Sequence, residues 1–174
     1  MKRISRMSVL FVLALFALTP QLHAQGVRTI FLMRHADKVS DAYDSPLNDQ
    51  GHRRARCLAN MLGDAHIEQI FTSNLQRTQQ TAAPLASRLQ LKPVAIPADK
   101  PDELVDAIRS GNAGNVLVVW HGGSLPSVLR ALGGPEVAPI GNAEYDRFYV
   151  LTLAADPNHP EVRFTVLRYC DCTK

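Results

Sequence analysis

The sequence predicts an α/β fold, a three-layer α/β/α sandwich whose mainly parallel sheet carries helices on both faces. Two observations support this prediction. Segments with the apolar pattern of strands alternate with segments of helical pattern, which is typical of parallel sheets covered by helices. The two clearest strands, 29–33 and 116–120, are uncharged and largely apolar throughout. Such continuous runs are typical of strands that are buried on both faces.

Polar cap residues and prolines set the boundaries of the helices. Asn48 can cap the first helix, and Ser73 or Asn74 the second, because these side chains accept hydrogen bonds from the free N–H groups of a first turn. Pro101 suits the first turn of a third helix, and Ser124 can cap the fourth. The predicted strands are 29–33, 67–72, 94–96, 115–120, 147–154 and 162–169, and the predicted helices end near residues 62, 89, 110 and 132.

Residues 1–24 have the layout of a secretory signal peptide. Three basic residues lie among the first six, an apolar stretch follows over 7–18, and a small-residue cleavage site follows at Ala24. This order of regions is typical of export signals, and the apolar stretch is too short to span a membrane comfortably. We expect cleavage after Ala24, export to the periplasm or the exterior, no stable membrane insertion, and a single domain over 25–174.

The charge balance gives little support to nucleic-acid binding. The formal net charge is +3, from 19 basic and 16 acidic side chains, and removal of the three basic residues of the 1–24 segment leaves 16 − 16 = 0. No block rich in Lys and Arg follows this segment, and such a block is the usual electrostatic signature of nucleic-acid binding. The sequence does not indicate an oligomeric state.

The three cysteines are Cys57, Cys170 and Cys172. An oxidising compartment allows a disulfide, but an odd number of cysteines leaves the pairing open. Cys170 and Cys172 lack further Cys or His residues at the spacing of zinc sites. We therefore predict no metal site at this end of the chain.

Cationic side chains follow two predicted strands and lie at the start of one predicted helix. Arg34 and His35 follow the first strand, His121 follows the fourth, and Arg77 lies in the first turn of the second helix. Ligands bind at the carboxyl ends of parallel strands in open α/β sheets, and a helix N-terminus presents free N–H groups to an anion. Phosphate fits this set best, because each Arg can donate two hydrogen bonds to it.

Three motifs occur in a fixed order along the chain: LMRHADK at 32–38, TSNLQRTQQTA at 72–82 and VVWHGG at 118–123. Together they resemble the histidine phosphatase superfamily, with its phosphoglycerate mutase-like fold. The resemblance implies that His35 becomes phosphorylated and that Arg34, Arg77 and His121 hold the phosphoryl group. Ala36 stands where much of the superfamily has Gly, and we expect the loop to accept the added methyl group. The Arg-His-Ala-Asp-Lys form is similar to small exported or bacterial members.

The resemblance implies a phosphatase that hydrolyses a phosphate monoester, on a small molecule or a surface, through a phosphohistidine and without metal or cofactor. A neutral His35 would attack with one ring nitrogen while the other donates to a fixed acceptor, often a backbone carbonyl. Arg34, Arg77 and a protonated His121 would stabilise the transferring group. Both histidines are expected at strand ends that face solvent. The alternatives are a non-catalytic phosphate-binding module and, less favoured, a phosphomutase.

The group that protonates the leaving oxygen stays open. The superfamily often places a carboxylate between the second Arg and the second His, an interval that here contains Asp102 and Glu103. Both also suit an ordinary first-turn position that favours the helix dipole, and Glu144 is a third candidate. Lys38 lies close to the nucleophile loop and could bind substrate phosphate, although a solvated lysine explains it equally well. The sequence does not indicate which phosphate ester is the substrate.

Overall fold

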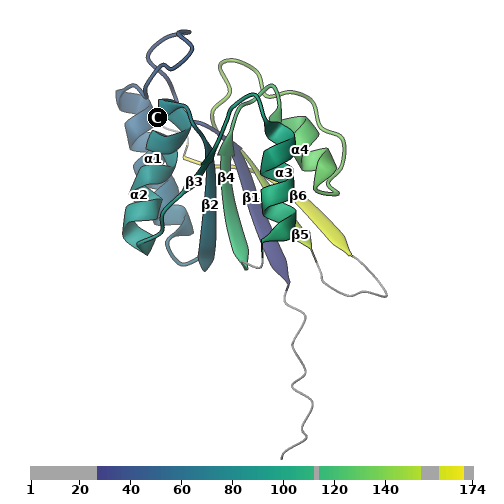
Figure 1. Ribbon diagram of the computed structural model, residues 1–174. Coiled ribbons are helices and arrows are strands. Elements are labelled where there is room, and N and C mark those ends of the chain that lie inside the picture. The colour runs from purple at the N-terminus through teal and green to yellow at the C-terminus, as the bar shows by residue number, and fades with distance from the viewer. Residues whose placement is uncertain (1–26, 112–113, 154–160, 171–174) are drawn as a thin grey trace, which may run out of the picture.

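A computed structural model describes residues 27–111, 114–153 and 161–170. Its helices and strands follow the predicted order, β-α-β-α-β-α-β-α-β-β (Figure 1). The strands are β1 (Arg28–Arg34), β2 (Ile67–Ser73), β3 (Val94–Ile96), β4 (Asn115–Trp120), β5 (Arg147–Leu153) and β6 (Val162–Arg168). The helices are α1 (Asp49–Leu62), α2 (Gln76–Leu89), α3 (Pro101–Ser110) and α4 (Leu125–Ala131).

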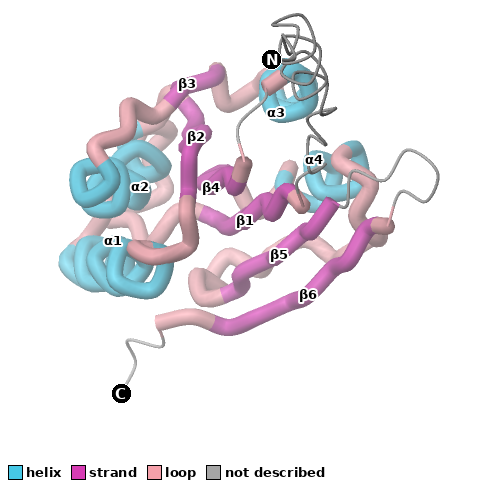
Figure 2. The backbone as a smooth tube through the Cα atoms, turned by 90° about the horizontal axis from the view of Figure 1, so that it is seen from below, coloured by secondary structure: helices cyan, strands magenta, loops and turns pink. Residues whose placement is uncertain are grey.

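The strands form one mixed sheet in the order β3-β2-β4-β1-β5-β6. The pairs β1–β4, β2–β4 and β2–β3 are parallel, whereas β5 runs antiparallel to β1 and β6 runs antiparallel to β5. Helices α1 and α2 cover one face of the sheet, and α3 and α4 cover the other, as Figure 2 shows. The predicted three-layer sandwich with a mainly parallel sheet is confirmed.

The packing of strand β4 explains why its sequence does not alternate between apolar and polar residues. Val116, Val118 and Trp120 pack with α3 and α4. Leu117 and Val119 pack on the other face, with α1 and α2. All five side chains are fully buried. Because helices cover both faces of the sheet, both sets of positions require apolar residues, and the strand becomes a continuous apolar run.

Several chain segments meet at one edge of the sheet. Strands β1, β2 and β4 are parallel, so their carboxyl ends lie at this edge, with Arg34 opposite Trp120 in the register. Strand β5 is antiparallel to β1 and therefore begins there, which brings the preceding loop, 133–146, to the same edge. Strand β6 is antiparallel to β5 and therefore ends there. This edge is where the predicted site residues are expected to gather.

The prediction that Ser73 or Asn74 caps α2 is wrong. The helix begins at Gln76, and no side chain at the cap position accepts a hydrogen bond from its first turn. The carboxylate of Asp44, in the loop 39–47, instead accepts a hydrogen bond from the Gln76 N–H at 2.7 Å. The acceptor comes from a segment 32 residues earlier in the chain, so local spacing could not reveal it.

The other predicted caps have different outcomes. Asn48 caps α1, because its side chain accepts a hydrogen bond from the Gly51 N–H at 2.8 Å. Pro101 occupies the first turn of α3 as predicted. Ser124 stands at the N-cap position of α4, but its side chain makes no capping hydrogen bond. The positions of these helix starts were therefore predicted more reliably than the hydrogen bonds that cap them.

A disulfide joins Cys57 of α1 to Cys170, which follows β6. The Cα atoms of the two residues are 6.0 Å apart, and 113 residues separate them in the sequence. A crosslink that closes so long a loop is expected to stabilise the fold mainly by restricting the unfolded chain. Cys172 and the predicted signal peptide, 1–24, lie outside the described residues.

Candidate active site

The two arginines and two histidines predicted to form the phosphate site lie together at the carboxyl edge of the sheet. Arg34 and His35 lie at the end of β1, His121 follows β4, and Arg77 is in the first turn of α2. The His35 N–H donates to the Trp120 carbonyl at 2.9 Å, which holds the two strand ends together. The ring centres of His35 and His121 are 5.7 Å apart, and Arg77 Nη2 lies 3.4 Å from His121 Nδ1.

His35 is a neutral imidazole with a defined tautomer. Its Nδ1 lies 2.8 Å from the Ala36 carbonyl oxygen, which only accepts, so Nδ1 carries the proton and Nε2 keeps its lone pair. Burial, and then the positive charges of Arg34 and Arg77, lower the pKa of His35 to about 3. The residue is only 3% exposed. The expectation that it faces solvent is wrong, because surrounding residues cover the strand end, among them Tyr145 with its ring centre 6.1 Å away.

The loop accepts Ala36 in the position where Gly is common. Ala36 is fully buried and packs with Leu47 and Ala55 in a small apolar cluster. Its N–H donates to Thr81 Oγ1 of α2 at 2.9 Å. The methyl group therefore contributes to packing, and the peptide beside His35 is held from both α1 and α2.

His121 is also neutral in the free protein. An Arg side chain only donates, so the contact with Arg77 makes His121 Nδ1 an acceptor. Nε2 then carries the proton and donates to the Ser73 hydroxyl at 2.9 Å. Burial, followed by the charges of Arg77 and Arg34, lowers the pKa of His121 to about 4. Without a ligand His121 is therefore uncharged, because burial and the two guanidiniums disfavour a third positive charge. The expected protonated form concerns the transfer of the phosphoryl group and stays a prediction.

The guanidinium of Arg34 is held in one orientation by the loop that precedes β5. Its Nη1 donates to the carbonyl oxygens of Gly141, Asn142 and Glu144 at 2.7, 3.0 and 3.2 Å. The Tyr145 ring stacks on it, with the Arg34 Cζ atom 4.3 Å from the ring centre. Since the side chain is ordered before an anion arrives, binding costs less conformational entropy.

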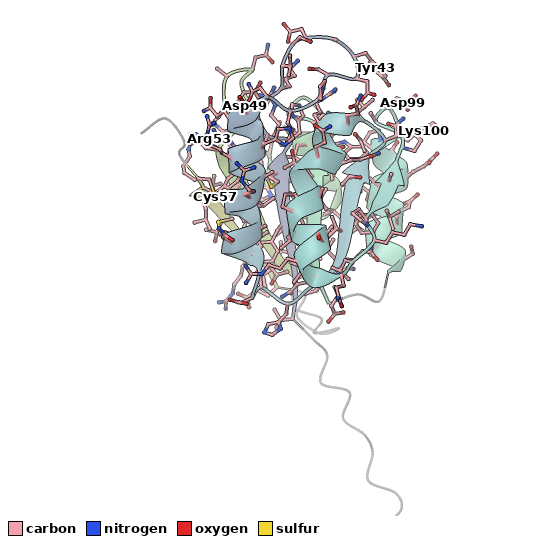
Figure 3. The ribbon with its side chains drawn as sticks, turned by 90° about the vertical axis from the view of Figure 1, so that its left-hand side faces the viewer. Tyr43, Asp49, Arg53, Cys57, Asp99 and Lys100 are labelled. Atoms are coloured by element: carbon pink, nitrogen blue, oxygen red, sulfur yellow. A yellow bond between two sulfur atoms is a disulfide. The ribbon has the colours of Figure 1, made fainter. Side chains whose placement is uncertain are left out.

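Arg77 is held by the loop 39–47. Its Nη1 donates to the Tyr43 carbonyl at 2.5 Å, while the neighbouring Asp44 carboxylate accepts hydrogen bonds from the Gln76 N–H and Nε2 at 2.7 and 3.1 Å. Figure 3 shows the Tyr43 side chain in this loop, beyond the end of the sheet. The loop is thus fastened to the start of α2, directly beside the site.

Neither Asp102 nor Glu103 is joined to a histidine by any contact within the described part of the chain. Both lie exposed in the first turn of α3, and Glu103 pairs with Lys100 at 3.2 Å. Their placement therefore fits the helix-dipole explanation as well as a catalytic one. Lys38, proposed as a phosphate contact, pairs with Asp41 at 2.7 Å.

The third candidate acid, Glu144, is engaged by two arginines. Its carboxylate lies 2.7 Å from Arg147 Nη2 and 2.7 Å from Arg168 Nη1. Because Glu144 also supplies one of the carbonyls that hold Arg34, these ion pairs fix the loop that orients a predicted phosphate-binding residue. A carboxylate bonded in this way is poorly placed to deliver a proton.

Two residues beside the site were missed by the sequence reasoning. Ser73 is fully buried at the end of β2, where its hydroxyl contacts His121. Its position carried a signal, because β2 and β4 are parallel neighbours and both end beside the site. Tyr145 lies in a loop without regular structure, and no periodicity in the sequence places its ring on Arg34.

Residues 27–111, 114–153 and 161–170 contain neither a metal-binding cluster nor a membrane-spanning helix. No group of three or more His, Cys, Asp or Glu side chains in these ranges is placed to hold a metal ion. No helix in them has the length and apolar character needed to cross a membrane.

Comparison with known sequences matches residues 30–104 to the family described as the histidine phosphatase superfamily (branch 1). The "Probable phosphoglycerate mutase GpmB" of Yersinia enterocolitica is 40% identical over 75 residues, which cover 39% of this chain and 35% of that protein. The "Fructose-2,6-bisphosphatase TIGAR B" of Danio rerio is 49% identical over 39 residues, which cover 22% of this chain and 15% of that protein. The chain thus spans about a third or less of the length of these relatives.

Solved structures share the fold. The protein histidine phosphatase SixA complexed with tungstate has a TM-score of 0.57 at 22% identity, with 83% of this chain and 98% of that chain covered. A mycobacterial glucosyl-3-phosphoglycerate phosphatase has a TM-score of 0.59 at 17% identity, with 83% and 100% covered. The fold and the ordered motifs define an α/β protein with the histidine phosphatase fold. Residues 30–104 thus match the histidine phosphatase superfamily, branch 1, and the fold of the described residues agrees with that match.

Proposed function

We propose that the chain is a phosphoric monoester hydrolase that works through a phosphohistidine on His35. The observation that carries the proposal is the contact of 2.8 Å between His35 Nδ1 and the Ala36 carbonyl. With Nδ1 protonated, Nε2 keeps its lone pair, and burial beside Arg34 and Arg77 keeps the ring neutral at neutral pH. A neutral, oriented imidazole is a competent nucleophile for phosphoryl transfer.

Arg34, Arg77 and His121 are the proposed phosphoryl-binding groups. The transferring group spreads negative charge over three oxygens, and donors that are oriented beforehand stabilise this charge effectively. Both guanidiniums already donate to backbone carbonyls, which supports their role as fixed donors. A bound phosphate dianion favours the protonated form of His121, so binding is expected to raise its pKa above about 4 and add a third positive charge.

The reaction has two steps. In the first, His35 Nε2 forms a bond to phosphorus while the bond between phosphorus and the ester oxygen breaks. The leaving oxygen takes a proton from water or from an acid, and an aryl oxygen needs this help least because it is weakly basic. In the second, the oxygen of a water molecule forms a bond to phosphorus and gives a proton to solvent while the bond between phosphorus and His35 Nε2 breaks, which releases inorganic phosphate and neutral His35.

The test measures phosphate release from an aryl phosphate by the purified chain 25–174, with and without a chelator. The proposal expects turnover that the chelator does not change, and a covalent phosphate on the wild-type protein that His35→Ala lacks. Activity that disappears with the chelator and returns with a divalent ion would contradict the histidine mechanism.

The same assay separates the two alternatives. A non-catalytic phosphate-binding module would bind inorganic phosphate saturably but release none from the ester and form no phosphohistidine. A phosphomutase would pass the phosphoryl group to a second hydroxyl of an organic phosphate instead of to water. The hydrolase is favoured because all four predicted residues are present and adjacent.

A panel of phosphate esters would then identify the substrate class, with the loops 39–47 and 133–145 as the proposed specificity elements.

We also propose that residues 1–24 direct export to the periplasm or the exterior. The basic, apolar and small-residue regions support this proposal, and the Cys57–Cys170 disulfide is compatible with an oxidising compartment. Mass spectrometry of the exported fraction should find a chain that begins at Gln25. An exported protein that retains Met1 would contradict the cleavage.

A further inference from the structure

A buried arginine on α1 connects the nucleophile loop to the disulfide. Arg54 Nε donates to the Asp37 carboxylate at 2.7 Å, and Arg54 Nη1 donates to the Cys170 carbonyl at 2.6 Å. Arg54 and Asp37 are 4% and 7% exposed, and a buried ion pair is favourable only when its remaining hydrogen bonds are made. Neither residue is the proposed nucleophile or one of the three proposed phosphoryl-binding groups.

Asp37 holds the peptide that carries the acceptor of His35. The Ala36 carbonyl belongs to the planar peptide between Ala36 and Asp37, so a rotation of Asp37 moves that oxygen. The Asp37 carbonyl accepts a hydrogen bond from the Asn48 N–H at 3.0 Å. Gly51 packs so closely that a Cβ there would lie 2.1 Å from the same oxygen. With its side chain bonded to Arg54, Asp37 is thus fixed to α1 by both backbone and side chain.

The disulfide brings the second acceptor to Arg54. Cys57 lies three residues after Arg54 on α1, and Figure 3 shows it along this helix beyond Asp49 and Arg53. Its bond to Cys170 ties the chain that follows β6 to the helix. Cys170 has a φ of +47°, an uncommon and strained value for a residue other than Gly. Loss of the crosslink removes the tie to α1, and we expect this strained backbone then to relax and its carbonyl to move away from Arg54.

We propose that Arg54 is a positioning residue that makes the reactivity of His35 depend on the Cys57–Cys170 disulfide. This inference rests on the proposed function and adds redox control to it. A dithiol reductant gives two electrons and two protons to the disulfide, becomes a cyclic disulfide itself, and leaves two cysteine thiols. Arg54 then loses one acceptor, the peptide before Asp37 is held less firmly, and the tautomer of His35 is less well defined.

The expected effect is on kcat, because Arg54 and Cys170 act on His35 through Asp37 and are not among the proposed phosphoryl-binding groups. A small displacement of a reacting group lowers the rate by up to about 10²-fold. We expect dithiothreitol to lower kcat for an aryl phosphate within this range and to leave KM almost unchanged. A Cys172→Ser background excludes exchange with the third cysteine. Assays are made below the melting transition of each reduced variant.

Two substitutions test the connection through Arg54. Arg54→Met removes both hydrogen bonds, so kcat should fall and reduction should cause little further loss, because coupled changes are not additive. Arg54→Lys keeps a positive charge for Asp37 but cannot serve both acceptors, and it covers the case in which the Met variant does not fold. Arg54→Lys should show a smaller loss of kcat than Arg54→Met and a weaker response to reduction than the wild-type protein. Arg53→Met, an exposed neighbour on α1, should behave as wild type in both respects.

Ring-nitrogen NMR of His35 separates this inference from the proposed function. Reduction and Arg54→Lys should each shift the Nδ1 signal of His35 toward the other tautomer, whether or not the protein hydrolyses a phosphate ester. An unchanged His35 signal would overturn the inference. So would losses of kcat that simply multiply when reduction and Arg54→Met are combined, since these would show independent effects.

Discussion

The Nδ1 atom of His35 lies 2.8 Å from the carbonyl oxygen of the next residue, Ala36. This contact joins two neighbouring residues and decides which ring nitrogen of His35 can act as the nucleophile. Because a carbonyl only accepts, the proton stays on Nδ1 and the lone pair on Nε2. The N–H of Ala36, which belongs to the peptide between His35 and Ala36, donates to Thr81 Oγ1 of α2 at 2.9 Å. Helix α2 therefore helps to hold the tautomer of a residue on β1.

Replacement of His35 with Ala should abolish both turnover and the trapped phosphoprotein. No other group in the proposed mechanism forms the covalent bond, so no slower phosphorylated form is expected. Rapid-quench labelling with a radioactive phosphate ester measures this directly. Label that persists in His35→Ala would assign the nucleophile to another residue. Thermal melts should accompany the assay, because the side chain is buried and its loss leaves a cavity.

Replacement of His121 with Ala should slow turnover and still allow phosphorylation. The change removes one donor from a preorganised site while Arg34 and Arg77 remain, and loss of one such donor typically costs about 10²- to 10³-fold in rate. The labelling experiment should therefore still find phosphate on His35. If label disappears in His121→Ala and persists in His35→Ala, the two roles are reversed.

The two imidazoles should not titrate in the usual range of histidine. The pKa is about 3 for His35 and about 4 for His121, lowered by burial and then by the nearby guanidiniums. An ordinary imidazole titrates near pH 6.5. NMR of the free protein should show both rings neutral from about pH 5 to pH 8. Added inorganic phosphate should raise the pKa of His121, and an inflection near pH 6.5 without phosphate would contradict the burial argument.

The same pKa values should make the protein less stable in acid. Both lie below the unfolded value of about 6.5, so below that pH the unfolded chain binds protons that the folded protein does not. The contribution of these two histidines to the free energy of unfolding is therefore constant above about pH 6.5 and decreases as the pH falls toward 4 and 3. At pH 5 the decrease is at most roughly 2 kcal/mol per histidine. Urea unfolding at about pH 7 and 5 measures this. The double variant His35→Gln, His121→Gln should lose less stability between these pH values.

Much of the fold could be predicted because its causes are local. The continuous apolar runs of β1 and β4 follow from helices on both faces, and Asn48 caps α1 within its own turn. The strand order β3-β2-β4-β1-β5-β6 could not be predicted from the sequence, because it depends on pairing between distant segments. The cap of α2 failed for the same reason, since Asp44 comes from another loop.

The same distinction between local and distant causes applies to the site. Arg34, His35, Arg77 and His121 could be predicted to lie together because each stands at the end of an element whose direction the α/β pattern implies. A neutral His35 was expected from the mechanism that the resemblance implies, whereas the neutral His121 of the free protein was not, because it depends on burial and on the contacts that the loops create. The bonding of Glu144 by two arginines likewise required the three-dimensional arrangement of the loop before β5 and the end of β6.

Replacement of Ser73 with Ala should weaken phosphoryl transfer without unfolding the protein. The Ser73 hydroxyl accepts a hydrogen bond from the His121 Nε2–H at 2.9 Å and so holds this ring with its Nδ1 toward Arg77. Loss of one hydrogen bond of this kind costs about 1 kcal/mol. If the whole of this cost is added to the activation free energy, kcat falls roughly five- to tenfold. Steady-state assays should show this fall, and ring-nitrogen NMR should show a mixed tautomer of His121. Ser127→Ala, which removes an exposed hydroxyl bonded only within its own turn, is the matched control. A Ser73→Ala protein with wild-type kcat and an unchanged His121 signal would exclude the positioning role.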